Sequence, residues 1–425
     1  MDSKGCSPIP SALFDWITFF TKSLPLRSVP TFIELLVGAM LTQSGFVVQS
    51  GAVIDLGRHW TTYFKWLQRG KWSWLALARQ IARLVAKWFP CEACYLVIDD
   101  TLVFRSSTKA PDSQIHHQHA KKSNRPTFVQ GQGWVSLAVV VGNDFRHCAI
   151  PILARLTRSI GNTPKLTIAK TLLRAVNGIF QNVTLLLDAW FMRATLVLFA
   201  VQSHLHVIGQ VRKDTALYAF PSPRPIGKRG RPRKYGDKLT QEHIESLEKT
   251  NTVLWLYGKN QAVCYRSVVV MARFLKGMAV RAVWTCFVDD KGKSSTPRLL
   301  IATNAELTPE AVIVEYARRW SIEPMFGQTK NGWGWKETWQ QSRQVLHRWV
   351  HILFAAYALP QLLTILGGDQ VRQLANFTPW RINHTVTAGL VRTGLQKYFS
   401  NIRVRDWWDA KSRKFVPPNG IVLTG

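Results

Sequence analysis

Acidic residues are scarce in this sequence: 25 Asp and Glu stand against 55 Lys and Arg, and the formal net charge of the 425 residues is +30. The basic excess is spread along the chain rather than gathered in one tail, which predicts a polyanionic partner. Nucleic acid is the first candidate, and an anionic membrane surface is the alternative.

Long uninterrupted apolar runs are also missing. The most apolar stretch, residues 350–366, contains His351, Pro360 and Gln361. We therefore expect a buried pair of helices there rather than a membrane span. No positively charged segment followed by an apolar run opens the sequence, so we expect a cytoplasmic protein without a membrane partner.

Cysteine is sparse, with six residues in the chain. Six scattered cysteines exclude a dense disulfide scaffold and indicate reduced thiols. Cys91 and Cys94 form one C-x-x-C pair, but no second pair lies at zinc-ribbon spacing, which argues against a zinc site. His116, His117 and His119 lack a helical or cysteine partner, so they favour a solvated basic loop near DNA over a metal site.

Hydrophobic periodicity divides the chain into helical and strand-forming parts. We expect residues 1–90 to form a basic helical domain that binds DNA or packs on the rest. Residues 91–204 and 297–340 combine strand and helix patterns, residues 205–296 are rich in strands, and residues 341–425 are helical and basic. The fold class is therefore α/β, with a core interrupted by a β-rich insertion and flanked by helical domains.

Carboxylates follow two of the apolar strands. Residues 95–98 lead into Asp99 and Asp100, and residues 183–187 lead into Asp188. Acidic residues at the ends of neighbouring strands converge at one edge of a sheet, where α/β proteins build their sites. Alternation puts Asp99 and Asp100 on opposite faces, so only one of them can point into a given site. A turn or helix cap is the alternative role of such an Asp-Thr sequence.

A polar stripe lies on a predicted helix near residue 320. Its members are Tyr316, Arg319, Glu323 and Lys330. At roughly 100° per residue, these side chains fall within about 60° of one helical face. If Ser321 caps a new helix, Pro324 lies in its first turn and the stripe is divided by a kink. The stripe is either a solvated helix face or a set of ligands for a metal ion and a phosphodiester.

A basic segment interrupts the insertion at residues 227–236. Its Pro and Gly residues prevent regular structure, and its five cations predict an extended basic finger. The sequence RGRP, which begins at Arg229 and includes Arg231, resembles an AT-hook that places arginines in a narrow A·T minor groove. Arg233 continues the basic run. A flexible linker that contacts only phosphates is the alternative, and both interpretations predict DNA.

Two strand-end aspartates and a helical glutamate give the chain a resemblance to a bacterial insertion-sequence DDE transposase. It resembles the cut-and-paste group, which has a β-strand insertion in an RNase H-like core and a Tyr-x2-Arg-x3-Glu-x6-Lys signature. Residues 316–330 match this signature at all four positions, and the resemblance covers about residues 90 to 340. It implies that Asp100, Asp188 and Glu323 hold two Mg²⁺ ions, for which Mn²⁺ can substitute. Asp100 is preferred to Asp99 because the family's first aspartate directly precedes a Thr.

The resemblance also implies the activity and the partners. The expected protein is an endonuclease and strand transferase that acts on double-stranded DNA, namely terminal inverted repeats and target DNA. Arg319 and Lys330 then hold phosphates, and Tyr316 packs against or bonds the backbone. Synapsis of two ends predicts a homodimer, formed alone or only on DNA, in the bacterial cytoplasm and on the nucleoid. The alternatives are a regulatory or architectural DNA-binding protein with an inactive nuclease core, and a nuclease without strand transfer.

One feature departs from the family pattern. Hairpin-forming members carry a Trp, just before the last core strand, that stacks on a flipped base. Residues 296–300 contain no Trp, and Trp284 and Trp255 in the insertion are candidates to replace it. The sequence leaves open whether the second strand is cut through a hairpin or by hydrolysis.

Overall fold

The computed structural model of the protein describes residues 9–117, 126–157, 165–223, 231–289, 291–377 and 385–417. The strands are β1 (Cys94–Phe104), β2 (Gln114–His117), β3 (Phe128–Gly142), β4 (His147–Leu156), β5 (Val183–Leu187), β6 (His206–Val211), β7 (Leu217–Tyr218), β8 (Thr250–Leu256), β9 (Lys259–Ala272), β10 (Met278–Phe287), β11 (Arg298–Ala302), β12 (Trp408–Asp409) and β13 (Lys414–Phe415). The α-helices are α1 (Ser11–Thr21), α2 (Val29–Leu41), α3 (Val47–Ala52), α4 (Thr61–Arg69), α5 (Trp74–Trp88), α6 (Lys165–Val176), α7 (Ala194–Gln202), α8 (Gln241–Ser246), α9 (Pro309–Ala317), α10 (Ile322–Gly332), α11 (Arg343–Leu366), α12 (Asp369–Ala375) and α13 (Ala388–Phe399).

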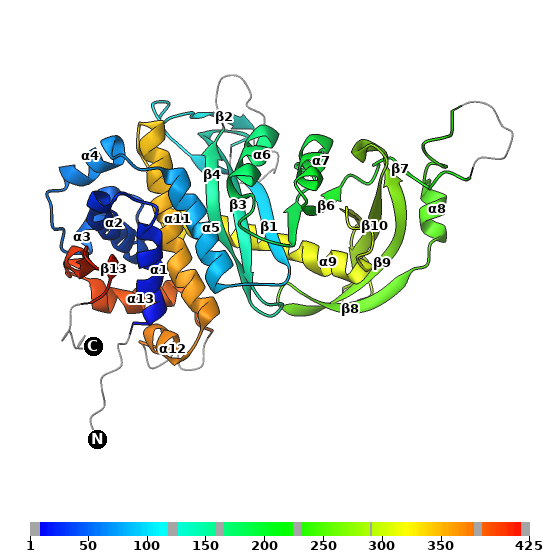
Figure 1. Ribbon diagram of the computed structural model, residues 1–425. Coiled ribbons are helices and arrows are strands. Elements are labelled where there is room, and N and C mark those ends of the chain that lie inside the picture. The colour runs from blue at the N-terminus through cyan, green and yellow to red at the C-terminus, as the bar shows by residue number, and fades with distance from the viewer. Residues whose placement is uncertain are drawn as a thin grey trace.

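One large mixed sheet runs through the middle of the molecule (Figure 1). Its order is β2-β3-β1-β5-β6-β11-β10-β9-β7, with β4 paired to β3 and β8 paired to β9. The strands β1, β5 and β6 are mutually parallel, whereas β3 and β11 flank them in antiparallel pairing. The α/β class is confirmed, and the arrangement is consistent with an RNase H-like core.

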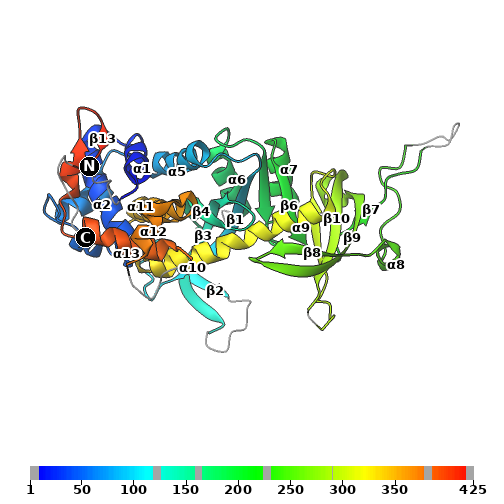
Figure 2. The same cartoon turned by 90° about the horizontal axis from the view of Figure 1, so that it is seen from below.

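Helices cover the two faces of this sheet unequally. Seen from below, α5, α6 and α7 lie on one side of the core strands, and α9 and α10 run along the other (Figure 2). Every residue of β5 is buried, as expected for a strand covered on both faces. The sheet therefore separates a face that carries the 316–330 stripe from a face that carries α5 and α6.

Strand β1 is longer than the sequence predicted. We expected it to end at Ile98, but it continues to Phe104, so Asp99 and Asp100 lie inside the strand. The reason is that the alternation resumes after the aspartates: Val103 is buried, and residues 99–104 keep pairing with β3. The aspartates are thus held by a regular ladder rather than by a turn.

The insertion is continuous with the core sheet. We predicted that it begins at residue 205, but β6 pairs in parallel with β5 and antiparallel with β11. Strand β11 in turn pairs with β10, so strands β7 to β10 extend the same sheet outwards (Figure 1). A strand-rich pattern on its own does not distinguish an added strand from a strand of the core, because both bury the same residue types.

The helices at the two ends of the chain pack together around α11. We predicted two helices over residues 350–366, but α11 is a single helix that continues through Pro360. Among the described residues, α11 is one helix that is long and apolar enough to cross a membrane; 89% of its most apolar window is buried inside the protein. It contacts α2, α4 and α5 from the N-terminal part and α13 from the C-terminal part.

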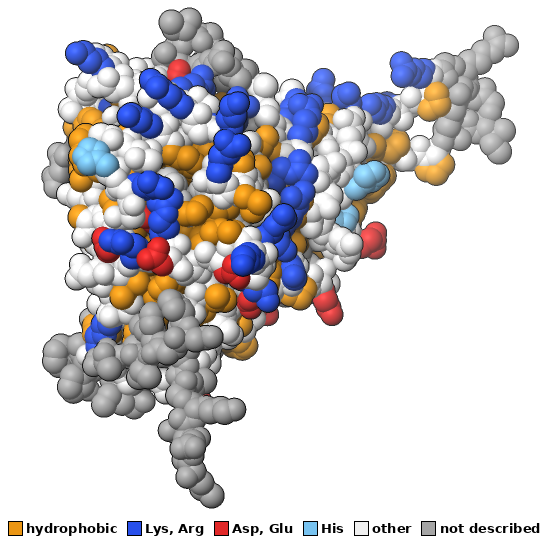
Figure 3. Space-filling view, turned by 60° about the vertical axis from the view of Figure 1, so that its left-hand side comes forward, with side chains coloured by type: hydrophobic (Ala, Val, Ile, Leu, Met, Phe, Trp, Pro, Cys, Tyr) orange, Lys and Arg blue, Asp and Glu red, His pale blue; other side chains and the backbone are white. Residues whose placement is uncertain are grey.

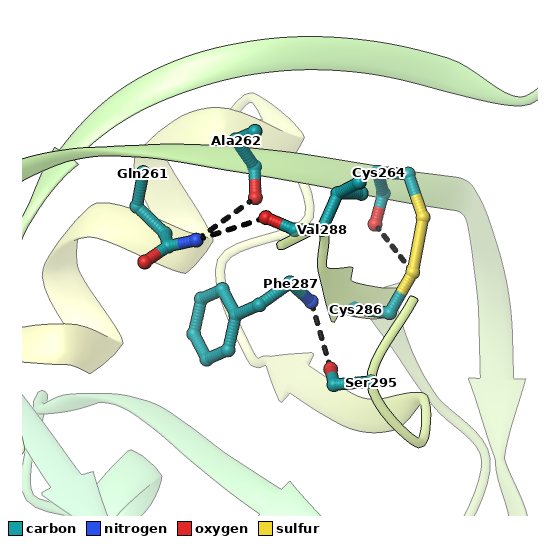
Figure 4. Close-up of a disulfide and its surroundings, with 7 residues drawn as sticks. All are labelled: Gln261, Ala262, Cys264, Cys286, Phe287, Val288 and Ser295. Atoms are coloured by element: carbon teal, nitrogen blue, oxygen red, sulfur yellow. Dashed lines mark hydrogen bonds between the residues drawn. A yellow bond between two sulfur atoms is a disulfide. The ribbon is translucent and has the colours of Figure 1, made fainter. Parts of the chain in front are cut away.

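One cysteine prediction is wrong. Cys264 and Cys286, expected to be reduced, form a disulfide between β9 and β10 (Figure 4). They are register partners in this antiparallel pair, with Cα atoms 5.4 Å apart. The pairing depends on strand register, which cysteine spacing does not reveal. Cys91, Cys94 and Cys148 are free thiols.

Candidate active site

Strand register brings two aspartates to the same level of the sheet. Strands β1 and β5 are parallel, and Ile98 pairs with Leu187. The next residue on β1 is Asp99, and the next residue after β5 is Asp188. Burial, and then the negative charge of Asp188, raise the pKa of Asp99 to about 7. The two carboxylates therefore lie close enough to repel one another.

Asp99 and Asp100 point to different partners. The Asp99 carboxylate is largely buried, and its Oδ2 lies 3.2 Å from Nη1 of Arg319. The Asp100 carboxylate lies 2.7 Å from Nζ of Lys165, the first residue of α6. Since α6 and α10 cover opposite faces of the sheet, the structure brings Asp99, and not Asp100, to the helix that carries Glu323 (Figure 2).

Arg319 joins the strand to the predicted stripe. Its guanidinium donates from Nη1 to Asp99 and from Nη2 to Oε1 of Glu323 at 2.9 Å. Both bonds are charge-assisted, and the side chain of Arg319 is only 15% exposed. Arg319 thereby holds a carboxylate of β1 and a carboxylate of α10 on either side of one cation.

The helix that carries the stripe is divided as expected. A 3₁₀ turn, Arg318–Ser321, separates α9 from α10, and Pro324 lies in the first turn of α10. Ser321 occupies the N-cap position, but its hydroxyl donates to the carbonyl of Arg318 instead of capping α10. The turn redirects the chain without separating Arg319 from Glu323.

The remaining two members of the stripe also reach the core. Lys330 donates from Nζ to Oγ1 of Thr101 at 2.6 Å and to the carbonyl of Leu102 at 3.3 Å. Tyr316 is buried beneath Arg319, and burial followed by the charge of Asp188 raises the pKa of its phenol to about 12. Arg319 and Lys330 thus bond β1 directly, whereas Glu323 and Tyr316 are joined to it through Arg319.

Asp188 is fixed by its own backbone. Its Oδ1 accepts the amide N–H groups of Trp190 at 3.0 Å and Phe191 at 2.9 Å. Phe191 is fully buried, so the turn after β5 is anchored in the core. The helix α7 therefore begins only at Ala194, after this turn.

The donor set fits a divalent metal by its chemistry. Asp99, Asp188 and Glu323 offer carboxylate oxygens, which hard cations such as Mg²⁺ prefer. Burial, and after it the neighbouring charge of Asp188, raises the pKa of Asp99. Within the described ranges, no three His, Cys, Asp or Glu side chains already stand close enough to share one ion. Arg319 stands between two of the carboxylates and bonds one oxygen of each, Oδ2 of Asp99 and Oε1 of Glu323.

Three exposed aromatic residues border the site, and sequence reasoning did not select them. Trp320 directly follows Arg319 and is 50% exposed, and its ring lies 6.4 Å from that of Tyr257 in the β8–β9 turn. Trp190, two residues after Asp188, lies 4.9 Å from Nζ of Lys165. Adjacency to a predicted site residue was the signal available for Trp320 and Trp190.

The two tryptophans that we selected lie on strands of the insertion, Trp255 on β8 and Trp284 on β10. Trp284 packs against the hydrophobic core in β10, and Trp255 lies against Phe145. Trp284 is also the register partner of Leu299 in β11, so this candidate adjoins the 296–300 segment directly.

The described residues include only part of the predicted histidine loop and of the basic finger. His116 and His117 belong to β2 rather than to a loop, and His116 bonds the carbonyl of Gly131. His119 and Arg229 lie outside the described residues. Arg231 and Arg233 are exposed and lie between β7 and α8 in the chain.

Comparison with known families identifies an endonuclease superfamily. A family model described as DDE superfamily endonuclease matches residues 35–262, more than half of the chain. The matched region contains both β1 and β5, with their aspartates, and ends before α10. No curated protein matches the chain.

Proposed function

The chain belongs to the DDE superfamily endonuclease family, and from this we propose that it is a transposase, which cuts DNA at the ends of its element and joins them to target DNA. The observation that supports this most is the Arg319 bridge between Asp99 and Glu323. It joins a core strand inside the matched region to a helix beyond it, through a signature residue.

The proposed metal ligands are Asp99, Asp188 and Glu323, for two Mg²⁺ ions that Mn²⁺ can replace. Asp99 replaces Asp100, our choice from the sequence, because Asp100 is paired with Lys165 on the other face of β1. When bound, such ions polarise a phosphodiester and activate water or a 3′-hydroxyl for in-line attack. Asp188 suits this role because backbone N–H groups already fix one of its oxygens.

The basic members of the stripe hold the DNA backbone in this proposal. Arg319 is planar and bidentate, so it can exchange a carboxylate for a phosphate without losing hydrogen bonds. Lys330 is anchored on Thr101 and adds a point charge on the same side of β1. Tyr316 supports Arg319 from below, with 5.9 Å between the guanidinium carbon and the ring centroid.

Double-stranded DNA is the proposed partner, as terminal inverted repeats and as target. The net charge of +30 supports this, as do the exposed Arg231 and Arg233 of the basic finger. Joining two ends requires that they be held together, so a homodimer is proposed, assembled alone or on DNA. The proposed setting is a bacterial cytoplasm, with the protein on the nucleoid when bound.

The test uses the DNA that flanks the reading frame as substrate. Purified wild-type protein with Mg²⁺ should nick this DNA at the element end and leave a 3′-hydroxyl. Glu323→Gln should bind the same DNA with similar affinity and cut at least about 10³-fold more slowly. Cutting by Glu323→Gln at the wild-type rate contradicts the proposal. Binding by the wild type without any cutting, in Mg²⁺ or Mn²⁺, favours a DNA-binding protein with an inactive nuclease core.

A further inference from the structure

Two neighbouring helices on the face opposite α10 carry cations and no acids. Neither α5 nor α6 contains a single Asp or Glu. Lys165, the first residue of α6, is paired with Asp100 and is set apart. The other cations of the two helices, together with one that follows α1, are Arg79, Arg83, Lys87, Lys170, Arg174 and Lys22; we call them the α5–α6 cations. Figure 3 shows that Lys and Arg side chains gather in rows on the side of the molecule seen there, with few Asp or Glu among them.

The spacing of these cations repeats along each helix. Arg79, Arg83 and Lys87 are four residues apart on α5, and Lys170 and Arg174 are four residues apart on α6. Each step is a rise of about 6 Å, close to the axial rise of about 7 Å across two phosphate steps of one DNA strand. Like charges at this spacing destabilise a helix by a few tenths of a kcal/mol per pair, so helix stability does not account for them.

Aromatic rings hold the cations in pairs. Lys22 and Lys87 both lie over the ring of Phe19, at 5.2 and 5.6 Å. Lys170 and Arg174 both lie over the ring of Phe199, at 5.9 and 4.9 Å. The packed stems keep like charges side by side at the surface instead of letting them separate.

The α5–α6 cations lack acidic partners. Within the described part of the chain none of the six forms an ion pair, although cations elsewhere do, such as Arg318 with Asp144 and Arg403 with Asp55. Arg83 bonds the neutral side chain of Gln80, and Nε of Arg79 is buried without a hydrogen-bond partner. A row of unneutralised charges of one sign is the electrostatic footprint of a polyanion.

We propose that the α5–α6 cations bind the phosphate backbone of duplex DNA, separately from the DNA held at Asp99 and Glu323. The choice of DNA rests on the proposed function. The sheet lies between the two surfaces, since α5 and α6 cover one face and α10 covers the other (Figure 2). The duplex form follows from the rings: Phe19 and Phe199 are covered by cations, so they do not serve as stacking platforms for single-stranded bases.

The test measures binding of a fluorescent 30-base-pair duplex of random sequence as salt is varied. The variant Arg83→Ala/Lys87→Ala/Arg174→Ala should lower the slope of log K against log salt by about 2.7, that is about 0.9 for each lost phosphate contact. Its affinity at 0.15 M salt should fall at least about 10-fold. The charge-conserving variant Arg83→Lys/Lys87→Arg/Arg174→Lys should keep the wild-type slope to within about 0.9, the value of one phosphate contact.

A second triple variant controls for net charge. Lys259→Ala/Lys291→Ala/Lys293→Ala removes three exposed cations of the insertion and should change the slope less than the α5–α6 variant does. For the wild type, lysine acetylation read by mass spectrometry should show protection of Lys87 and Lys170 when the duplex is added, which tests the proposal even if a variant misfolds.

An unchanged slope in the folded α5–α6 variant, or no protection of Lys87 and Lys170, overturns the proposal. Protection by anionic lipid vesicles but not by duplex DNA overturns it in favour of a membrane. End cutting by the wild type is measured separately, so a failure of the α5–α6 surface is distinguishable from a failure of the transposase proposal.

Discussion

Acidification should weaken the packing of α11 on β4, through two buried histidines. His347 and His351 lie one turn apart on α11, and each accepts a backbone N–H of β4 at Nε2: Leu156 to His347 at 3.4 Å and Ala154 to His351 at 3.3 Å. Their Nδ1 atoms lie 2.8 and 2.6 Å from carbonyl oxygens one turn earlier and donate to them. Protonation of Nε2 would set an N–H against an N–H, so only the neutral rings fit.

The size of the effect follows from the shifted pKa values. Burial lowers the pKa of His347 to about 4 and that of His351 to about 3, against about 6.5 in the unfolded chain. Below pH 6.5 the unfolded chain binds more protons than the folded protein does, so the free energy of unfolding decreases as the pH is lowered. From pH 8 to pH 5, protonation linked to each histidine lowers the free energy of unfolding by about 2 kcal/mol, or by about 4 kcal/mol for the two together. That is a large share of the 5–15 kcal/mol typical of folded proteins.

Asp99 acts in the opposite direction. Its pKa is raised to about 7 by burial and by Asp188, so the folded state binds a proton first and gains stability as the pH falls through 7. The assay therefore compares wild type with His347→Gln/His351→Gln, in which this contribution cancels. Urea unfolding is followed by tryptophan fluorescence at pH 8, 7, 6 and 5 with EDTA present.

From pH 8 to pH 5, the free energy of unfolding of the double variant should decrease by about 4 kcal/mol less than that of the wild type. Equal losses in the two proteins would refute the reasoning. Imidazole pKa values near 6.5 for His347 and His351 in the folded protein, measured by NMR, would refute it directly.

Three further predictions concern other parts of the molecule. Arg348→Met should lower the free energy of unfolding at pH 8 by about 3–5 kcal/mol. The reason is that the guanidinium donates to the carbonyls of Leu67, Gln68, Gly70 and Trp72, which the substitution leaves without this donor. The exposed Arg372→Met is the control, and a loss below about 1 kcal/mol for Arg348→Met would contradict the prediction. Chelation with EDTA should abolish end cutting, and Mg²⁺ or Mn²⁺ should restore it; cutting that persists in EDTA is the contrary result. Arg229→Ala/Arg231→Ala should weaken binding to A·T-rich duplexes more than to G·C-rich ones, as measured by anisotropy, whereas a uniform loss leaves only phosphate contacts.

Local patterns predicted the parts of the site that depend on local structure. An apolar run before Asp188 and the spacing of Tyr316, Arg319, Glu323 and Lys330 are properties of one strand and one helix. The structure brings Arg319, Glu323 and Lys330 to the side of β1 that carries Asp99, with Tyr316 packed against Arg319. Amphipathic spacing likewise predicted helical ends of the chain, which α5 and α11 illustrate.

Choices that depend on distant partners were not predictable in the same way. Asp99 and Asp100 are neighbours, and what separates them is Arg319 on one face and Lys165 on the other. The parallel pairing of β6 with β5 and the Cys264–Cys286 disulfide also depend on register between segments far apart in the chain. The continuous helix at Pro360 reflects burial by neighbouring helices, which overrides the local preference for a break.

Mg²⁺-dependent nicking of end DNA by Asp99→Asn and by Asp100→Asn shows which aspartate of β1 serves catalysis. Each substitution removes one charge from adjacent positions on β1, so the pair controls for charge and for strand packing. We expect Asp99→Asn to cut at least about 10³-fold more slowly while still binding, and Asp100→Asn to stay within about 10-fold of wild type. The opposite order, with Asp100→Asn inactive and Asp99→Asn active, would contradict the assignment of Asp99, and normal cutting by both would contradict a role for β1 in catalysis.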